Sequence, residues 1–289
     1  MKKILALCFF LLAAATLKAQ ETQTYKKVEY PAGYSEQLNV VYTVANGWEG
    51  KMDLYLPPKD KGPSPVVINI HGGGWNKGSK ESQTGFNTFF KKGYAVANIA
   101  YRLSQVAPAP AAVEDTRCAL IYLIKNAKAL NIDINKIVIM GGSAGGHLAL
   151  MGGLLGNDTR FDSNCKGVND VKVAAIINKY GIAELGDWPS KSLNMWLGNQ
   201  IKNPAFVQSV SPIYHVKKNS PPIFIVHGDA DPVVSYQQSV KLKKKLDEMG
   251  VKNTFITVEG GEHGKFPQEK NSEVNAAIMN FLKELGIHQ

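Results

Sequence analysis

Short, continuously apolar runs constrain the fold of this chain more than any other feature. Six of them follow one another at residues 66–70, 95–99, 137–140, 173–177, 223–226 and 255–258. Strands have this composition when both faces of their sheet are covered, which is the arrangement found in parallel sheets. Helical spacing of apolar residues over 110–129, 236–249 and 273–285 supplies the covering elements.

Two alternating stretches, residues 38–44 and 52–56, precede these runs and predict an antiparallel pair at a sheet edge. The whole pattern predicts a single α/β domain over residues 20–289, with a doubly wound, mostly parallel sheet of about eight strands and helices on both faces. Residues 182–221 have no strand pattern and are too long for an ordinary connection. We expect this insertion to lie over the active site as a lid.

The N-terminus has the layout of a secretory signal peptide over residues 1–19. A basic start at Lys2 and Lys3 precedes an apolar run at residues 4–15, and Ala19 offers a cleavage position. The run is too short to span a bilayer as a transmembrane helix. The sequence therefore predicts a secreted or periplasmic protein without an integral membrane segment.

Charge and cysteine content exclude several classes of function. The formal charge falls from +9 to +6 once the three lysines of residues 1–19 are removed. The basic runs lack interleaved aromatic residues, so nucleic acid is not an expected partner.

An oxidising compartment permits a disulfide between Cys118 and Cys165, but the helical pattern around Cys118 favours its being a small, unpaired residue of the core. No Cys/His cluster has metal-ligand spacing, and we expect neither a metal nor a cofactor.

The run at residues 137–140 leads into Gly141-Gly142-Ser143-Ala144-Gly145, which fits the G-x-S-x-G pattern. A strand precedes the pattern and a helix follows it, as a nucleophile elbow requires. Glycines on either side of the serine make room for a sharp turn that exposes its hydroxyl group. A phosphate-binding loop is the alternative, but the Gly-Lys-Ser/Thr ending of such loops is missing.

Later loops supply an acid and a base in the chain order that such a serine needs. His263 follows the last predicted strand, and Asp231 and Asp229 follow the strand before it. Asp231 is preferred because it lies further along the loop, directly before Pro232, and Asp229 stays the alternative. A histidine that removes the serine proton converts a weak nucleophile into an effective one.

A glycine-rich turn, His71-Gly72-Gly73-Gly74-Trp75, comes directly after the run at residues 66–70. Its backbone N–H groups and that of Ala144 can form an oxyanion hole. Together with the serine, aspartate and histidine loops, this turn resembles the α/β-hydrolases. The similarity is to secreted esterases of the feruloyl and acetylxylan type, which are related to the hormone-sensitive-lipase group.

That resemblance implies a nucleophile at Ser143, a base at His263 and an orienting carboxylate at Asp231. It also implies oxyanion donors at Gly73, Gly74 and Ala144. The expected function is a serine carboxylic-ester hydrolase that removes acetyl or feruloyl groups from plant polysaccharide fragments. Its substrate would be a small-molecule or oligosaccharide ester, and the oligomeric state stays open.

Three tryptophans are candidates for stacking on sugar or aromatic rings of a substrate, or for places in the core: Trp75, Trp188 and Trp196.

Two alternative functions on the same fold remain, an arylformamidase and a serine peptidase. The signal peptide argues against the first, and the lack of an extra N-terminal domain argues against the second. A binding protein on a hydrolase scaffold is a third reading, which would require a missing member of the serine, aspartate and histidine set.

Overall fold

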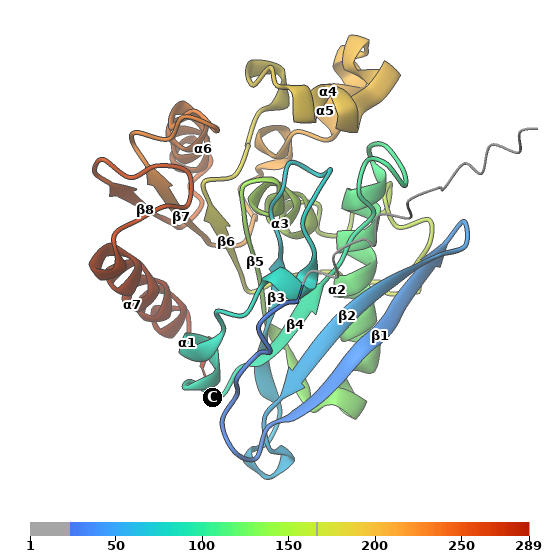
Figure 1. Ribbon diagram of the computed structural model, residues 1–289, viewed down its shortest axis with the longest axis vertical. Helices are drawn as coiled ribbons and strands as arrows, with labels where there is room; N and C mark the ends of the chain where they lie inside the picture. The colour runs from blue at the N-terminus through green and yellow to red at the C-terminus, as the bar shows by residue number, and fades with distance from the viewer. Residues whose placement is uncertain (1–23, 166, 289) are drawn as a thin grey trace, which may run out of the picture.

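A computed structural model describes residues 24–165 and 167–288 (Figure 1). The predicted signal peptide, residues 1–19, lies outside the described residues. An eight-stranded sheet crosses the molecule in the order β1-β2-β4-β3-β5-β6-β7-β8. Its strands are β1 (Ser35–Ala45), β2 (Trp48–Leu56), β3 (Ser64–Ile70), β4 (Ala95–Ile99), β5 (Ile132–Gly142), β6 (Ala175–Lys179), β7 (Ile223–Gly228) and β8 (Asn253–Val258).

Pairing within the sheet follows the sequence pattern. β1 and β2 pair antiparallel at one edge, β2 pairs antiparallel with β4, and every later pairing is parallel. Neighbouring residues of β3 show why the runs are continuously apolar, because Val66 and Ile68 face one core cluster while Val67 faces the other. The predicted mostly parallel, doubly wound sheet is confirmed.

Helices cover both faces of the sheet. One layer holds α1 (Asn87–Phe90) and α7 (Gln268–Glu284), and the other holds α2 (Ala111–Leu130), α3 (Ala144–Leu154) and α6 (Gln237–Glu248). Short 3₁₀ turns, η1 (Lys59–Lys61) and η2 (Lys80–Ser82), lie in the connections before β3 and α1. None of the helices within residues 24–165 and 167–288 combines the length and apolar composition needed to cross a bilayer.

Residues 182–221 form the long connection between β6 and β7, and they contain no strand. Their elements are η3 (Leu185–Asp187), α4 (Lys191–Leu197), η4 (Gly198–Lys202), α5 (Pro204–Ser209) and η5 (Pro212–His215). Figure 1 shows α4 and α5 at the top of the molecule, apart from both helical layers. The side-chain oxygen of Gln238 on α6 fixes the base of this insertion by accepting hydrogen bonds from the N–H groups of Ala183 and Glu184.

A disulfide joins Cys118 on α2 to Cys165 in the loop that leads from α3 toward β6. Cys118 is fully buried, as its helical pattern indicates, but it is also paired. The sequence left this pairing open because the approach of two segments 47 residues apart is not visible in local periodicity. The bridge fixes the long α3–β6 connection to α2.

Candidate active site

Ser143 lies at the sharp turn between β5 and α3, with a left-handed backbone at φ 57° and ψ −125°. A non-glycine residue in this region is strained, and such strain persists only where the surroundings enforce it. Those surroundings are tight: a Cβ at Gly145 would lie 2.2 Å from the carbonyl oxygen of Ile70, and one at Gly141 would lie 2.2 Å from that of Gly145. The two glycines of the motif let helix and strands approach closely enough to form the turn.

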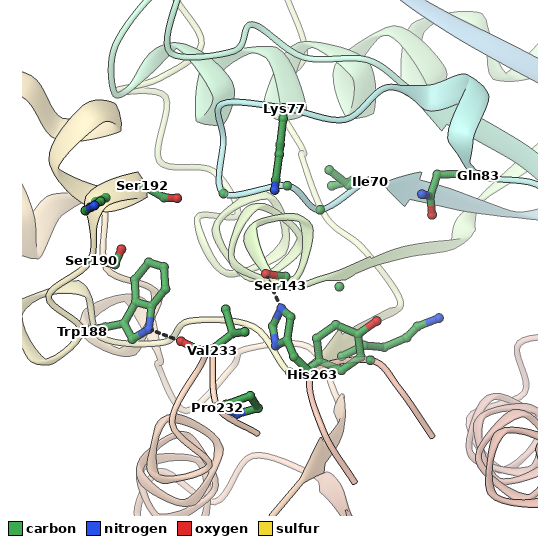
Figure 2. Close-up of a pocket in the computed structure, with 18 of the residues that line it drawn as sticks. Ile70, Lys77, Gln83, Ser143, Trp188, Ser190, Ser192, Pro232, Val233 and His263 are labelled. Carbon is green, nitrogen blue, oxygen red and sulfur yellow. Dashed lines mark hydrogen bonds between the residues drawn. The ribbon is translucent and has the colours of Figure 1, made fainter. Parts of the chain in front are cut away.

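A chain of hydrogen bonds runs from Ser143 through His263 to Asp231. The Ser143 Oγ lies 2.8 Å from His263 Nε2, and His263 Nδ1 lies 2.6 Å from Asp231 Oδ2. A carboxylate only accepts, so Nδ1–H donates to Asp231 and Nε2 is left to accept the serine proton. Figure 2 shows the bond between Ser143 and His263 at the centre of a cleft.

The three residues come from loops after β5, β7 and β8, which all end at the same edge of the parallel sheet. Ligand sites of open α/β sheets lie at this carboxyl edge. Of the two candidate carboxylates, Asp231 contacts the histidine. Asp229 turns away and accepts a 2.7 Å hydrogen bond from the N–H of Gly260.

Four groups surround the buried Asp231 carboxylate. Its Oδ1 accepts the N–H groups of Val233 and Val234, at 2.7 and 2.9 Å, and its Oδ2 lies 3.1 Å from His227 Nε2 as well as facing His263. Burial by itself raises the pKa of the Asp231 carboxyl, but the hydrogen bonds from His227, His263 and the two N–H groups outweigh it. The pKa therefore lies well below its usual range, and the carboxylate is ionised at neutral pH.

His227 is a site residue that sequence reasoning missed. Its Nε2 faces two acceptors, Asp231 Oδ2 and the carbonyl oxygen of Val234 at 3.0 Å, so this nitrogen carries the proton. Its Nδ1 then accepts the hydroxyl of Ser239 at 2.7 Å. The spacing of four residues between His227, near the end of β7, and Asp231, in the loop that follows, was the available signal.

Tyr180 is a second residue that the sequence did not reveal. Its ring meets the imidazole of His263 edge to face, with centroids 4.9 Å apart. The contact restricts the rotation of the histidine ring. A tyrosine directly after a buried strand is indistinguishable from a core residue in the sequence alone.

The glycine turn after β3 lies beside the serine. Gly73 and Gly74 both have left-handed φ values, 111° and 60°, and both line the cleft with Ser143. Within the described part of the chain, neither of their N–H groups donates a backbone hydrogen bond. Ala144 is the first residue of α3, where N–H groups have no partner in the helix. The N–H groups of Gly73, Gly74 and Ala144 are thus candidate oxyanion donors in the two turns that meet at the cleft.

A cleft of about 730 Å³ opens above the hydrogen-bonded chain. The insertion forms one wall through Trp188, Ser190, Lys191 and Ser192. Figure 2 shows Trp188 and Gln83 on opposite sides of Ser143 and His263. The indole N–H of Trp188 donates to the carbonyl oxygen of Val233 at 2.8 Å, and this bond ties the insertion to the Asp231 loop.

Trp188 is the only one of the three candidate tryptophans that lines the cleft. Trp75 and Trp196 are fully buried and stack on each other with centroids 4.5 Å apart, so the expectation that they contact a substrate is wrong. The Trp75 indole N–H donates to His147 Nδ1 at 3.3 Å. Their role is to join the glycine turn, α3 and α4 in one core.

Three-residue clusters of His, Cys, Asp or Glu that could hold a metal ion are absent from residues 24–165 and 167–288. The arrangement at the site is that of an acid–base relay ending in a hydroxyl group, beside free N–H donors. Such an arrangement can activate the hydroxyl and stabilise a negative oxygen.

Comparison with known proteins gives several similarities. Esterase LipQ of Mycobacterium tuberculosis is 28% identical over 86% of this chain and 62% of its own length. Esterase LipC of the same organism is 27% identical over 70% of this chain and 53% of its own length. The chain thus spans little more than half the length of these two curated relatives.

A solved structure described as a truncated form of a carbohydrate esterase from gut microbiota is 30% identical, with a TM-score of 0.79. The similarity covers 90% of this chain and 99% of that one. The profile of the BD-FAE family matches residues 52–246, which include Ser143 and Asp231 and most of the sheet. On this match the chain belongs to the BD-FAE family and has the α/β-hydrolase fold.

Proposed function

We propose that this protein is a serine carboxylic-ester hydrolase, with Ser143 as nucleophile, His263 as base and Asp231 as the orienting carboxylate. The observation that carries the proposal is the unbroken hydrogen-bonded chain from Ser143 Oγ through His263 to Asp231 Oδ2. The two mycobacterial relatives are named esterases, and the structure at 30% identity is named a carbohydrate esterase, which supports the same chemistry.

The geometry implies a two-step reaction. His263 Nε2 takes the proton of Ser143 as Oγ bonds to the ester carbonyl carbon, and the N–H groups of Gly73, Gly74 and Ala144 stabilise the resulting oxyanion. The carbonyl re-forms, the ester C–O bond breaks, and His263 gives its proton to the leaving alcohol. Water, deprotonated by His263, then attacks the acyl-serine, and the acid and the serine hydroxyl are released.

The substrate that we propose is an acetyl or feruloyl ester of a plant polysaccharide fragment. The cleft offers amide and hydroxyl groups for a sugar at Asn69, Gln83, Ser190 and Ser192, and the indole of Trp188 for a flat ring. Mixed lining of this kind fits a small acyl group on a polar alcohol better than a long alkyl chain. The insertion at residues 182–221 would act as the lid of this cleft.

We also propose that the protein is secreted or periplasmic. The signal-peptide layout of residues 1–19 supports export. The Cys118–Cys165 disulfide supports it independently, because such bonds persist in oxidising compartments.

A substrate panel tests the proposal. We expect hydrolysis of acetylated xylo-oligosaccharide or methyl ferulate, with little activity on an emulsified C16 or C18 ester. Ser143→Ala protein is the matched blank for background hydrolysis. A preference for the emulsified ester that rises at the oil–water interface would overturn the carbohydrate-ester assignment while leaving a general esterase. Absence of hydrolysis on every ester, short-chain activated esters included, would overturn the esterase itself.

A further inference from the structure

Three lysines line the cleft, and no acidic residue does. They come from three different elements: Lys77 from the glycine turn, Lys179 from the end of β6 and Lys191 from the start of α4. Within the described part of the chain, none of the three has a carboxylate within ion-pairing distance. The cleft therefore collects three positive charges without counter-charges of its own.

The acids that come close to the cleft in sequence are already engaged elsewhere. Asp187, which precedes Trp188, pairs with Lys241 on α6, and Glu262, which precedes His263, pairs with Lys265 at 3.2 Å. Asp231 is buried beneath His263, with a side chain 0% exposed, and is occupied by its hydrogen bonds. None of these carboxylates neutralises the lysines of the cleft.

Lys179 is the most constrained of the three. It pairs in the sheet with Gly142, next to Ser143, and its carbonyl oxygen accepts the N–H of Ser143 at 2.9 Å. Its neighbour Asn178 packs toward α3, so strand alternation turns Lys179 to the opposite face, on the side of the cleft lined by Asn69 and Gln83. Burial lowers the pKa of Lys179, as expected for an ammonium group with little water around it and no acid partner.

Lys77 and Lys191 bring charge from the other walls. Both are exposed, and Figure 2 shows Lys77 extending from its loop in the direction of Ser143. Ammonium groups on three sides of one cleft create a positive potential that attracts anions and disfavours cations. A neutral acetylated sugar has no group that uses this potential.

From this arrangement we propose that the cleft selects esters that carry a carboxylate, such as an acylated fragment containing a sugar acid. The proposal rests on the esterase function above and narrows its substrate class. The carboxylate would occupy the side of the cleft at Lys179, with Lys77 and Lys191 contributing from the walls. It could belong to the alcohol or to the acyl part, and the test separates these two sources.

The test compares matched charged and neutral substrates at pH 7. For the alcohol part, O-acetylated methyl glucuronoside is compared with the same compound as its primary amide. For the acyl part, mono-p-nitrophenyl adipate is compared with its amide, after subtraction of spontaneous hydrolysis. We expect kcat/KM to favour the acid by about tenfold in at least one pair, the effect of one charge pair of modest strength. The pair that shows the preference identifies the source of the carboxylate.

Single variants locate the effect. Lys77→Gln, Lys179→Gln and Lys191→Gln should each lower the ratio of charged to neutral kcat/KM, with Lys179→Gln lowering it most. The matched control is Lys218→Gln, an exposed lysine in the connection that enters β7, at the opposite edge of the sheet. The ratio is measured within each variant, so partial loss of overall activity does not affect the comparison. Added salt should reduce the wild-type ratio, because it screens the exposed lysines.

Ratios within twofold of one for both substrate pairs would overturn the inference, and so would ratios that none of the three cleft variants changes. Either result, obtained with an enzyme that hydrolyses the neutral esters, leaves the esterase function intact. If none of the four compounds is hydrolysed, and p-nitrophenyl acetate is not hydrolysed either, the result would instead count against the esterase function.

Discussion

Asp231 is the residue on which the two histidines of the site converge. The hydrogen bond from His263 Nδ1–H to Asp231 Oδ2 fixes the tautomer in which Nε2 faces Ser143 as an acceptor. His227 Nε2–H donates to the same carboxylate oxygen. Chain order placed Asp231 and His263 in the right loops, since each follows a strand of a parallel sheet. The contact of His227 with Asp231 and the burial of Trp75 and Trp196 were not predictable, because both depend on packing between distant segments.

Asp231→Asn should reduce kcat by about 10⁴-fold, because an amide in place of the carboxylate favours the wrong histidine tautomer. Asp229→Asn is the matched control, since Asp229 bonds to the N–H of Gly260 and does not contact His263. Steady-state kinetics on a short-chain ester measures both. A larger loss in the Asp229 variant would show that the wrong carboxylate has been assigned.

Among the elements, the junction of β5 and α3 determines where the nucleophile lies. Apolar runs predicted both ends of β4 and the first residue of β7, because both strands begin with apolar residues and consist mostly of them. β5 begins at Ile132, well before its apolar run, because Ile132 already pairs with Ser64 of β3, and the register then shifts before Ile137 pairs with Val66. The residues between these two pairs are mostly polar and leave no hydrophobic signal, so the sequence predicted only the second half of this strand.

Gly145→Ala should destabilise the fold by more than about 3 kcal/mol, since the new methyl group would overlap the carbonyl oxygens of Ile70 and His71. Denaturant unfolding followed by circular dichroism measures the change. Gly85→Ala provides the control, because a Cβ there meets nothing within 4 Å. Equal stabilities for the two variants would contradict the close approach of α3 to β3.

At the scale of the whole molecule, two connections hold the outer segments to the sheet. The disulfide joins α2 to the α3–β6 loop. His147 on α3 joins the glycine turn to the insertion, because its ring accepts the indole N–H of Trp75 and donates to the carbonyl oxygen of Val210. The sequence predicted the layers and the position of the insertion, because these follow from the order of apolar runs. It did not predict these cross-connections, which join segments far apart along the chain.

Replacing both Cys118 and Cys165 with alanine should lower the free energy of unfolding by about 4 kcal/mol, the loop-closure value for the 47-residue separation. Thermal and denaturant unfolding of the purified variant measure the loss. The site lies away from the bridge, so kcat of the folded variant should stay near the wild-type value. An unchanged stability would show that the bridge does not constrain the unfolded chain.

His147 should make stability depend on pH. Burial lowers its pKa to about 4, and its ring accepts the Trp75 N–H and donates to the carbonyl oxygen of Val210. In the unfolded chain the pKa of His147 is near 6.5. Between about pH 6.5 and 4 the unfolded chain therefore binds a proton at His147 that the folded state does not bind, and the folded state becomes less stable as the pH falls.

Over that pH range the wild type should lose roughly 3 kcal/mol of stability that His147→Gln does not lose, because glutamine has no proton to bind. Urea unfolding of both proteins at several pH values measures the difference. A difference that stays constant from pH 7 to 4 would contradict the assignment of a buried, neutral His147.

The turnover of Ser143→Ala on a short-chain activated ester tests the central claim most directly. The substitution removes one hydroxyl group that lines the cleft, so the thermal midpoint of unfolding should stay close to that of the wild type. We expect kcat/KM to fall by about 10⁴-fold or more, with the residual rate coming from the oxyanion donors and substrate binding. A folded Ser143→Ala protein that retains activity within tenfold of the wild type would contradict the account.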